Sequence, residues 1–119
     1  MEITEHTIGQ LRVAQIHTTE TLFQTVDDAT DFIGYIYYQG FDALILDATH
    51  IATHFFDLRT KIAGEILQKF TNYRMRITLV GDWRNISSDS LSDFIRECNS
   101  GKQVHFAQNL DEALTKLAT

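Results

Sequence analysis

The segment FDALILDATHIATHFFDLRTKIAGEILQKFTNYRMRITLVGD, residues 41–82, decides the fold. Near its start, residues 43–46 are apolar without alternation, which is typical of a strand covered on both faces. MRITLV, residues 75–80, has the same character and ends at Gly81. Between these runs, apolar residues recur at helical spacing and predict an amphipathic helix. They are Leu58, Ile62, Ala63, Ile66, Leu67, Phe70 and Tyr73.

The rest of the chain continues this alternation of strand and helix. Two β-prone runs, residues 3–8 and 11–16, flank Gly9-Gln10 and predict a hairpin with a type II′ turn. Helices are predicted after Thr25, after Ser87 or Ser88, and after Asn109, and QVHF at 103–106 indicates a short strand. The order ββαβαβαβα predicts an α/β fold, with a mixed, mostly parallel five-strand sheet, an N-terminal hairpin and four helices. We expect one domain, residues 1–119.

Charge and composition narrow the classes of function. The net charge of −6 and the scattered basic residues, densest at Arg74 and Arg76, argue against direct nucleic-acid binding. No apolar run approaches the ~20 residues that span a bilayer, so no membrane association is expected. The N-terminal residues lack a signal-peptide pattern, and we expect a cytoplasmic protein. Cys98 is the single cysteine, and its place on a helical apolar face predicts a buried, inert thiol.

Two stretches are distinctive in their residues: FFDLRTKIAGEILQKFTNYRMRITLVGD at 55–82 and SLSDFIRECNSGKQVHF at 90–106. They resemble a family of short bacterial proteins that is catalogued only as a domain of unknown function. The likeness covers about residues 40–119 and depends mainly on the aromatic and Ala-Gly-Glu core of the first stretch. It implies no established activity.

The element order and the ending FAQNLDEALTKL, residues 106–117, resemble the STAS domain of anti-sigma-factor antagonists. This resemblance implies the same order of strands and helices and a role in binding protein partners. Some members of that family are phosphorylated on a serine at the start of the second helix, where residues 54–60 stand here. The usual Asp-Ser-Ser-Gly pattern is missing, and only Asp57 and Thr60 offer similar chemistry, so the phosphoserine switch is not carried over.

The carboxyl edge of the predicted parallel strands is the place to expect a binding site. The candidate residues follow the predicted strands or begin the next helix: Asp47, His54, Phe55, Phe56, Asp57, Arg59, Thr60, Asp82, Trp83 and Ser88. A helix that begins near Asp57 would direct free N–H groups to this edge and favour an anion or a phosphorylated hydroxyl. Asp47 and Asp82 are most simply explained as solvated turn acids; as functional groups they would pair with Arg59 or Arg84, or hold a cation.

Aromatic residues near this edge allow two interpretations. Phe55 and Phe56 diverge in direction, so one is expected to staple the helix start. The other either forms an apolar patch with Trp83 or packs beneath a loop. Tyr35 and Tyr38 either contribute to an interface or only cover the end of their helix. Gly64, inside the helix predicted between the two central strands, is explained by a close approach of another helix or of a second subunit, and equally by local packing within the monomer.

Motifs for catalysis and metal binding are weak. His50 and His54 have the spacing H-x-x-x-H, and Asp57 offers a third ligand, but the segment is a predicted loop without the Glu of H-E-x-x-H. We therefore expect no metal ion and no other cofactor. Neither a glycine-rich phosphate loop nor a nucleophile elbow is present. Catalysis would require Asp47, His50 and Asp82 to lie within hydrogen-bond reach of one another in a pocket.

The leading hypothesis from the sequence is a non-enzymatic, STAS-like regulatory module that binds a protein partner or a second copy of itself. The Asp57 helix start, together with Phe55, Phe56 and Trp83, would form the contact surface. The alternative is a small-molecule or nucleotide sensor that holds an anion at the N-terminus of the helix starting near Asp57.

Overall fold

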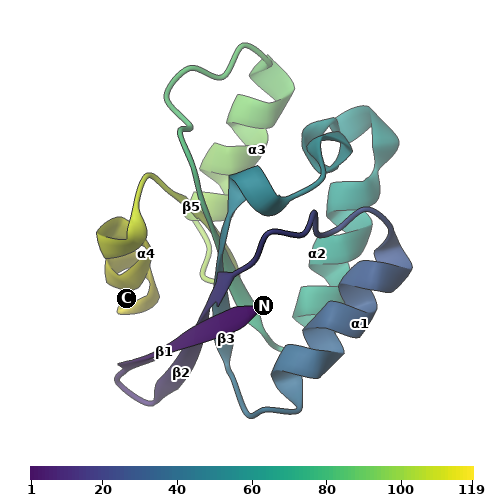
Figure 1. Ribbon diagram of the computed structural model, residues 1–119. Coiled ribbons are helices and arrows are strands. Elements are labelled where there is room, and N and C mark those ends of the chain that lie inside the picture. Colours follow the sequence, from purple (N-terminus) through teal and green to yellow (C-terminus); the bar gives the residue numbers. More distant parts are fainter.

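The computed structural model describes residues 1–119 and contains five strands and four helices (Figure 1). The strands are β1 Glu2–Ile8, β2 Leu11–His17, β3 Ala43–Asp47, β4 Arg76–Val80 and β5 Val104–Ala107. The α-helices are α1 Val26–Tyr37, α2 Ile62–Asn72, α3 Asp89–Asn99 and α4 Leu110–Leu117. Three 3₁₀ turns precede α2: η1 Ala48–His50, η2 Thr53–Phe56 and η3 Leu58–Thr60. The predicted α/β class, with a mixed five-strand sheet and four helices, is confirmed.

The five strands form one sheet in the order β1-β2-β3-β4-β5. The first two strands are antiparallel and place Ile8 opposite Leu11, so the predicted hairpin is confirmed. Gly9 has φ +59° in its two-residue turn, a conformation that costs glycine little. All other neighbouring strands are parallel.

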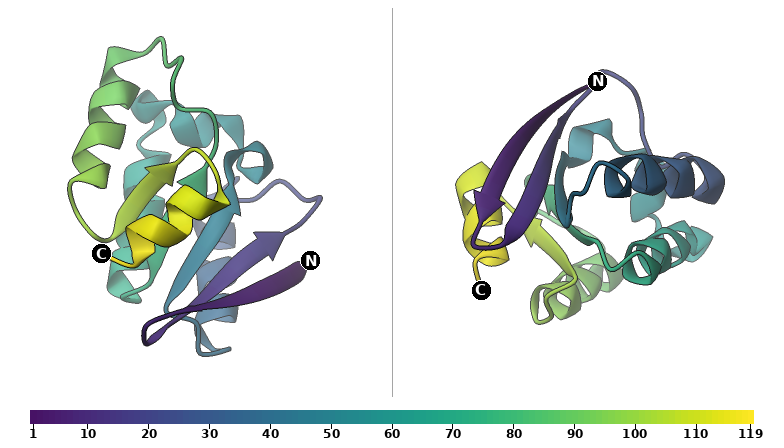
Figure 2. Two further views of the ribbon diagram at one scale, coloured as in Figure 1. Left: turned by 90° about the vertical axis from the view of Figure 1, so that its left-hand side faces the viewer. Right: turned by 90° about the horizontal axis from the view of Figure 1, so that it is seen from below.

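The helices are divided unequally between the two faces of the sheet. Each crossover adds the next strand in the same direction, so right-handed connections bring α1, α2 and α3 to a single face. Only α4, which follows the last strand, covers part of the opposite face (Figures 1 and 2). The strand order never reverses, and the sheet therefore lacks the switch-point crevice that many α/β proteins use for ligands.

The larger core lies between the sheet and α1, α2 and α3. Phe23 is at its centre, with ring centroids 5.8 Å from Phe55 and 5.9 Å from Phe70. The backbone of Phe23 has φ +62°, which is costly for a bulky residue and is maintained by this aromatic packing. A smaller core under α4 contains Val13, Ala43, Ile45, Ala107, Ala113 and Leu117.

Side-chain caps begin three of the four α-helices, as predicted. Thr25 Oγ1 accepts from Asp28 N at 3.0 Å, Ser88 Oγ from Leu91 N at 3.2 Å, and Asn109 Oδ1 from Glu112 N at 2.9 Å. Each bond satisfies a backbone donor that has no partner within the helix.

The prediction that a long helix begins near Asp57 is wrong, because α2 begins at Ile62 after Lys61, whose φ is +65°. Asp57 caps the short turn η3 instead. The reason lies in Thr60, whose hydroxyl donates to Asp57 O at 2.8 Å and accepts from Ile62 N at 3.3 Å. Such local bonds give the backbone an alternative to the helical ladder.

No helix of the structure combines the length and the apolar character needed to cross a membrane.

Candidate functional site

The loops that follow β3 and β4 lie side by side at the carboxyl edge of the sheet. A Cβ atom added to Gly81 would lie 3.2 Å from the Ala48 Cβ, so the two loops touch. Gly81 N also donates to Ala107 O at 3.0 Å, which brings the end of β5 to the same place. We call this edge, from Asp47 to Thr60 and from Gly81 to Ser90, the rim.

Trp83 anchors the rim. Its indole Nε1 donates to Ala107 O at 2.9 Å and to Leu79 O at 3.2 Å. Its ring centroid lies 4.9 Å from that of Phe106 and 5.7 Å from that of Phe56. Phe56 and Trp83 therefore meet, but both rings are half-buried, and Phe55 is fully buried beneath them. This arrangement favours rings that pack under a loop over an exposed apolar patch.

A groove of about 540 Å³ lies on the rim between η3 and the start of α3. It is lined by Phe56, Asp57, Leu58, Arg59, Ser88 and Ser90. Four of these six residues belong to the candidates expected from the sequence. The Arg59 side chain is 91% exposed, and Ser88 and Ser90 are exposed as well.

The start of this turn already binds an anion, which is the Asp57 carboxylate itself. It accepts from Arg59 N at 3.1 Å, from Arg59 Nε at 2.9 Å and from Arg59 Nη2 at 2.9 Å. The side-chain bonds from Arg59 lower the pKa of Asp57. The proposed anion site at a helix N-terminus near Asp57 is therefore corrected: no α-helix begins there, and the free N–H already binds a carboxylate.

Asp82 and Arg84 repeat the same geometry on the second loop. Arg84 donates to Asp82 from its backbone N at 3.2 Å, from Nε at 3.0 Å and from Nη2 at 3.2 Å. The hydrogen bonds from Arg84 lower the pKa of Asp82. Both Asp-x-Arg turns are open to solvent, so each pair steadies its loop locally and adds little stability.

The remaining candidates of the rim have structural roles. Asp47 Oδ1 accepts from Thr49 N at 2.9 Å and from Thr49 Oγ1 at 2.7 Å, and so caps η1. His54 Nε2 donates to Gln24 O at 2.8 Å and ties η2 to the residues before α1. His50 and His54 line separate pockets, and no group of three His, Cys, Asp or Glu residues has the arrangement of a metal site.

The structure also forms a cavity that the sequence did not predict. It lies on the face that α4 covers only in part and has a volume of about 480 Å³. Its lining comes from the ends of three parallel strands and from α4: Gln15, Ile16, His17, Thr18, Ile45, Asp47, His50, Val80 and Leu110. We call it the bowl. Alternation along β2 points Gln15 and His17 to the same face, which is the one signal for it in the sequence.

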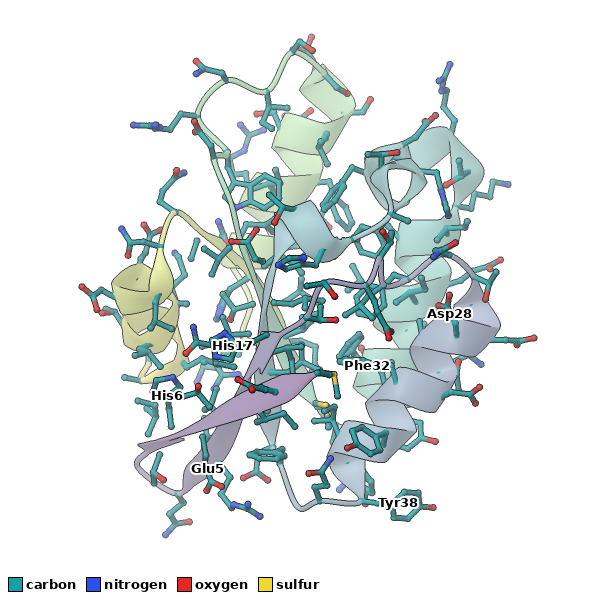
Figure 3. All side chains as sticks on the ribbon, viewed as in Figure 1. Glu5, His6, His17, Asp28, Phe32 and Tyr38 are labelled. Atoms are coloured by element: carbon teal, nitrogen blue, oxygen red, sulfur yellow. The ribbon has the colours of Figure 1, made fainter.

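Hydrogen bonds across the hairpin fix two side chains of the bowl. His17 Nε2 lies 2.8 Å from Thr4 Oγ1, and His6 Nε2 donates to Gln15 Oε1 at 2.8 Å. Figure 3 shows His6 and His17 on the side of the sheet that faces α4. Asp47 and His50 share the bowl, but Asp82 is not part of its lining. The convergence of Asp47, His50 and Asp82 that catalysis would need is not formed.

Cys98 is half-buried rather than fully buried. Burial, with a smaller contribution from Glu97, raises the pKa of its thiol to about 11. The thiol is thus a poor nucleophile at neutral pH, as the sequence predicted.

The fold and the rim together define an α/β protein with one continuous open sheet, a braced carboxyl edge and two shallow pockets beside it. The chain belongs to the family described as Domain of unknown function (DUF4180), whose model matches residues 8–117. The predicted membership in a family of unknown function is confirmed, and the match reaches further toward the N-terminus than residue 40. Comparison with curated proteins and with solved structures finds no match.

Proposed function

We propose that this protein is a non-enzymatic regulatory module of the cytoplasm, with a STAS-like fold, that binds a protein partner or a second copy of itself through the rim groove. The observation that supports the proposal is the meeting of the β3 and β4 loops around one groove with an aromatic floor. One domain, residues 1–119, carries this function.

Two residues of the groove, Phe56 and Arg59, are of kinds that are enriched in protein interfaces. Phe56 forms its floor, with ring centroids 5.0 Å from Phe55 and 5.7 Å from Trp83, so the ring is already held in place. A fixed aromatic ring loses little conformational entropy when a partner binds. Arg59 contributes an exposed guanidinium at the edge, and aromatic residues and arginine are enriched in protein interfaces.

The groove would work without the serine phosphorylation known from STAS domains. Thr60 is the only hydroxyl residue in the matching segment, residues 54–60, and its Oγ1 donates to Asp57 O at 2.8 Å. That hydroxyl therefore belongs to the turn that precedes α2. We propose that partner binding depends on the shape and charge of the groove instead.

A substitution pair that fills the groove tests this function. Arg59→Glu with Ser90→Tyr reverses the exposed charge and blocks the space, while Trp83 and its hydrogen bonds remain. The matched control is Arg96→Glu with Ser92→Tyr, the same changes on exposed positions of α3 outside the groove. Both variants and the wild type are used as bait for cross-linking in extracts, and light scattering follows self-association.

We expect a partner, or a dimer, that is retained by the wild type and the control and lost from the groove variant. The same set of cross-linked proteins with all three baits, and no change in molar mass, would contradict the proposal.

A second function is favoured by the bowl rather than by a helix N-terminus. We propose as the alternative that the protein senses a small polar molecule there. Asp47 Oδ2, which has no protein partner, and the amide of Gln15 would bind polar groups, and Ile45 and Val80 would contact apolar ones. Most ligand sites combine a few placed polar groups with apolar walls in this way.

A thermal-shift screen of small metabolites separates the two functions. A ligand of the bowl would raise the melting temperature of the wild type and of Arg59→Ala, but not of Gln15→Ala. A hit that survives Gln15→Ala and Asp47→Asn together would exclude the bowl as its binding site.

A further inference from the structure

The charges of this protein are distributed unevenly along the chain. Between Arg12 and Arg59 there is no lysine or arginine. The same stretch has seven acidic residues: Glu20, Asp27, Asp28, Asp31, Asp42, Asp47 and Asp57. Only Asp57 among them takes part in an ion pair. The net charge of −6 is therefore concentrated in the stretch that includes α1.

The outer face of α1 combines this acidity with aromatic rings. At 3.6 residues per turn, Asp27, Asp31, Tyr35 and Tyr38 fall within an arc of about 80°. This arc is opposite the buried residues of α1, which are Ala29, Ile33 and Ile36. Figure 3 shows Asp28 near one end of the helix and Tyr38 at the other, with Phe32 turned toward the interior. We call Asp27, Asp31, Tyr35 and Tyr38 the α1 stripe.

Apart from Met1, the exposed large hydrophobic side chains of the protein are three tyrosines near the aromatic end of the stripe. Tyr35 is 57% exposed and Tyr38 is 86% exposed. Tyr37 stands beside them, with ring centroids 5.7 Å from Tyr38 and 5.2 Å from Tyr73. All four tyrosines of the chain are thus near this end of α1. Exposed apolar patches of this kind mark interaction sites, and tyrosine is enriched in them.

The end of α1 has a cation from a neighbouring strand beside it rather than a basic residue of its own, because Arg12 Nη1 of β2 donates to Gln39 O at 3.0 Å. No basic residue is present in its last turn, although the helix dipole places partial negative charge there. A further cation that approached the stripe would meet the faces of the exposed rings and the unpaired carboxylate of Asp31, one turn before Tyr35. On the α2 side, Lys69 lines a groove with Val26 of α1, and Arg74 follows the end of α2.

From this complementarity we infer that the α1 stripe docks a basic segment of a partner protein, with lysine or arginine side chains over Tyr35 and Tyr38 and beside Asp27 and Asp31. The aromatic end of the stripe lies at the opposite end of the molecule from the rim, as Figure 1 shows for the end of α1. The inference goes beyond the proposed function of the rim, and either surface can fail its test without the other.

A peptide measurement tests this inference directly. The probe is a short fluorescent peptide of alternating lysine and glycine, and a glutamate–glycine peptide of the same length is the control ligand. Fluorescence anisotropy at low ionic strength should show binding of the lysine peptide only. Binding should weaken with added salt, because exposed charges are screened over about 10 Å at 0.1 M salt.

Two variants of the stripe should weaken binding. Tyr35→Ala with Tyr38→Ala removes both rings and is expected to raise the Kd about tenfold. Asp27→Asn with Asp31→Asn is expected to raise it about fivefold. All four side chains are exposed, so neither variant should unfold the protein.

The matched control is Asp89→Asn with Asp111→Asn, which removes the same charge from the first turns of α3 and α4. The control and the groove variant of the rim should bind the lysine peptide with a Kd no more than about twofold above that of the wild type. An equal loss of affinity in the control and in Asp27→Asn with Asp31→Asn would mean that the peptide responds only to the net charge of the protein. That result would overturn the inference. Unchanged binding by the tyrosine variant would overturn it as well.

Discussion

The indole N–H of Trp83 donates to the carbonyl oxygen of Ala107 at 2.9 Å, and this bond joins the loop after β4 to the end of β5. The same N–H reaches Leu79 O at 3.2 Å. One side chain thus closes the edge of the sheet on which the rim groove depends, and for this reason the groove variant leaves Trp83 unchanged.

Replacing Trp83 by phenylalanine should separate its hydrogen bonds from its packing. Trp83→Phe retains a ring against Phe56 and Phe106 but removes the donor, and we expect a loss of about 1–2 kcal/mol in the free energy of unfolding. Trp83→Ala also removes the ring and should cost about 3–5 kcal/mol. Urea denaturation measures both. An unchanged free energy of unfolding in Trp83→Phe would mean that the two hydrogen bonds contribute nothing to stability.

Gly64 should be replaceable by alanine with a gain in stability. It lies inside α2 with φ in the ordinary range, is exposed, and an added Cβ would meet no atom within 4 Å. The account in which another helix of this chain packs on Gly64 is therefore excluded. We expect Gly64→Ala to stabilise the protein by about 0.5–1 kcal/mol, because alanine loses less backbone entropy in a helix.

Gly40 is the matched control for Gly64. It has φ +86°, and an added Cβ would lie 2.5 Å from Arg12 Nη1, so Gly40→Ala should destabilise the protein. If both alanine variants were destabilising by thermal denaturation, Gly64 would have a role that the single chain does not explain, such as contact with a second subunit.

Acid should loosen the two Asp-x-Arg turns of the rim. Their arginines hold the pKa of Asp57 and of Asp82 below the value in the unfolded chain. The folded state therefore binds these protons less readily, and the contribution of the pairs is complete above about pH 4, the ordinary pKa of aspartate. It is lost as the pH falls further through the folded pKa.

Denaturation curves between neutral pH and about pH 2 measure this dependence. The double variant Asp57→Asn with Asp82→Asn should show a shallower loss of stability below about pH 4 than the wild type. Asp89→Asn is a control that changes one exposed acid outside the rim. Identical curves for the wild type and the double variant would show that the turns are not coupled to folding.

Cys98 should react slowly with thiol reagents while the protein is folded. Burial raises the pKa of this thiol to about 11, so very little thiolate is present at pH 8. The rate of reaction with a chromogenic disulfide should rise as the pH is increased from 8 toward this pKa. It should also increase strongly after denaturation in urea. Equal rates for the folded and the unfolded protein at pH 8 would contradict the assignment.

Several features of this fold could be predicted because they depend on residues close together in the chain. The caps Thr25, Ser88 and Asn109 bind N–H groups only three residues away. The hairpin needs Gly9 and two runs of β-prone residues beside it. The predicted start of α2 near Asp57 is wrong for a related reason. The apolar spacing extends back to Leu58, but the hydrogen bonds of Thr60 keep the residues before Ile62 out of the helix.

The sequence by itself therefore determined the order and most of the ends of the helices and strands, because hydrophobic spacing and caps act over a few residues. Only the tertiary structure decided which side chains meet. The bowl joins Gln15 of β2 to Asp47 of β3 and Val80 of β4, and the indole of Trp83 finds the carbonyl of Ala107. These contacts depend on strand order and on the single helix that covers the second face, which arise from packing between segments far apart in the chain.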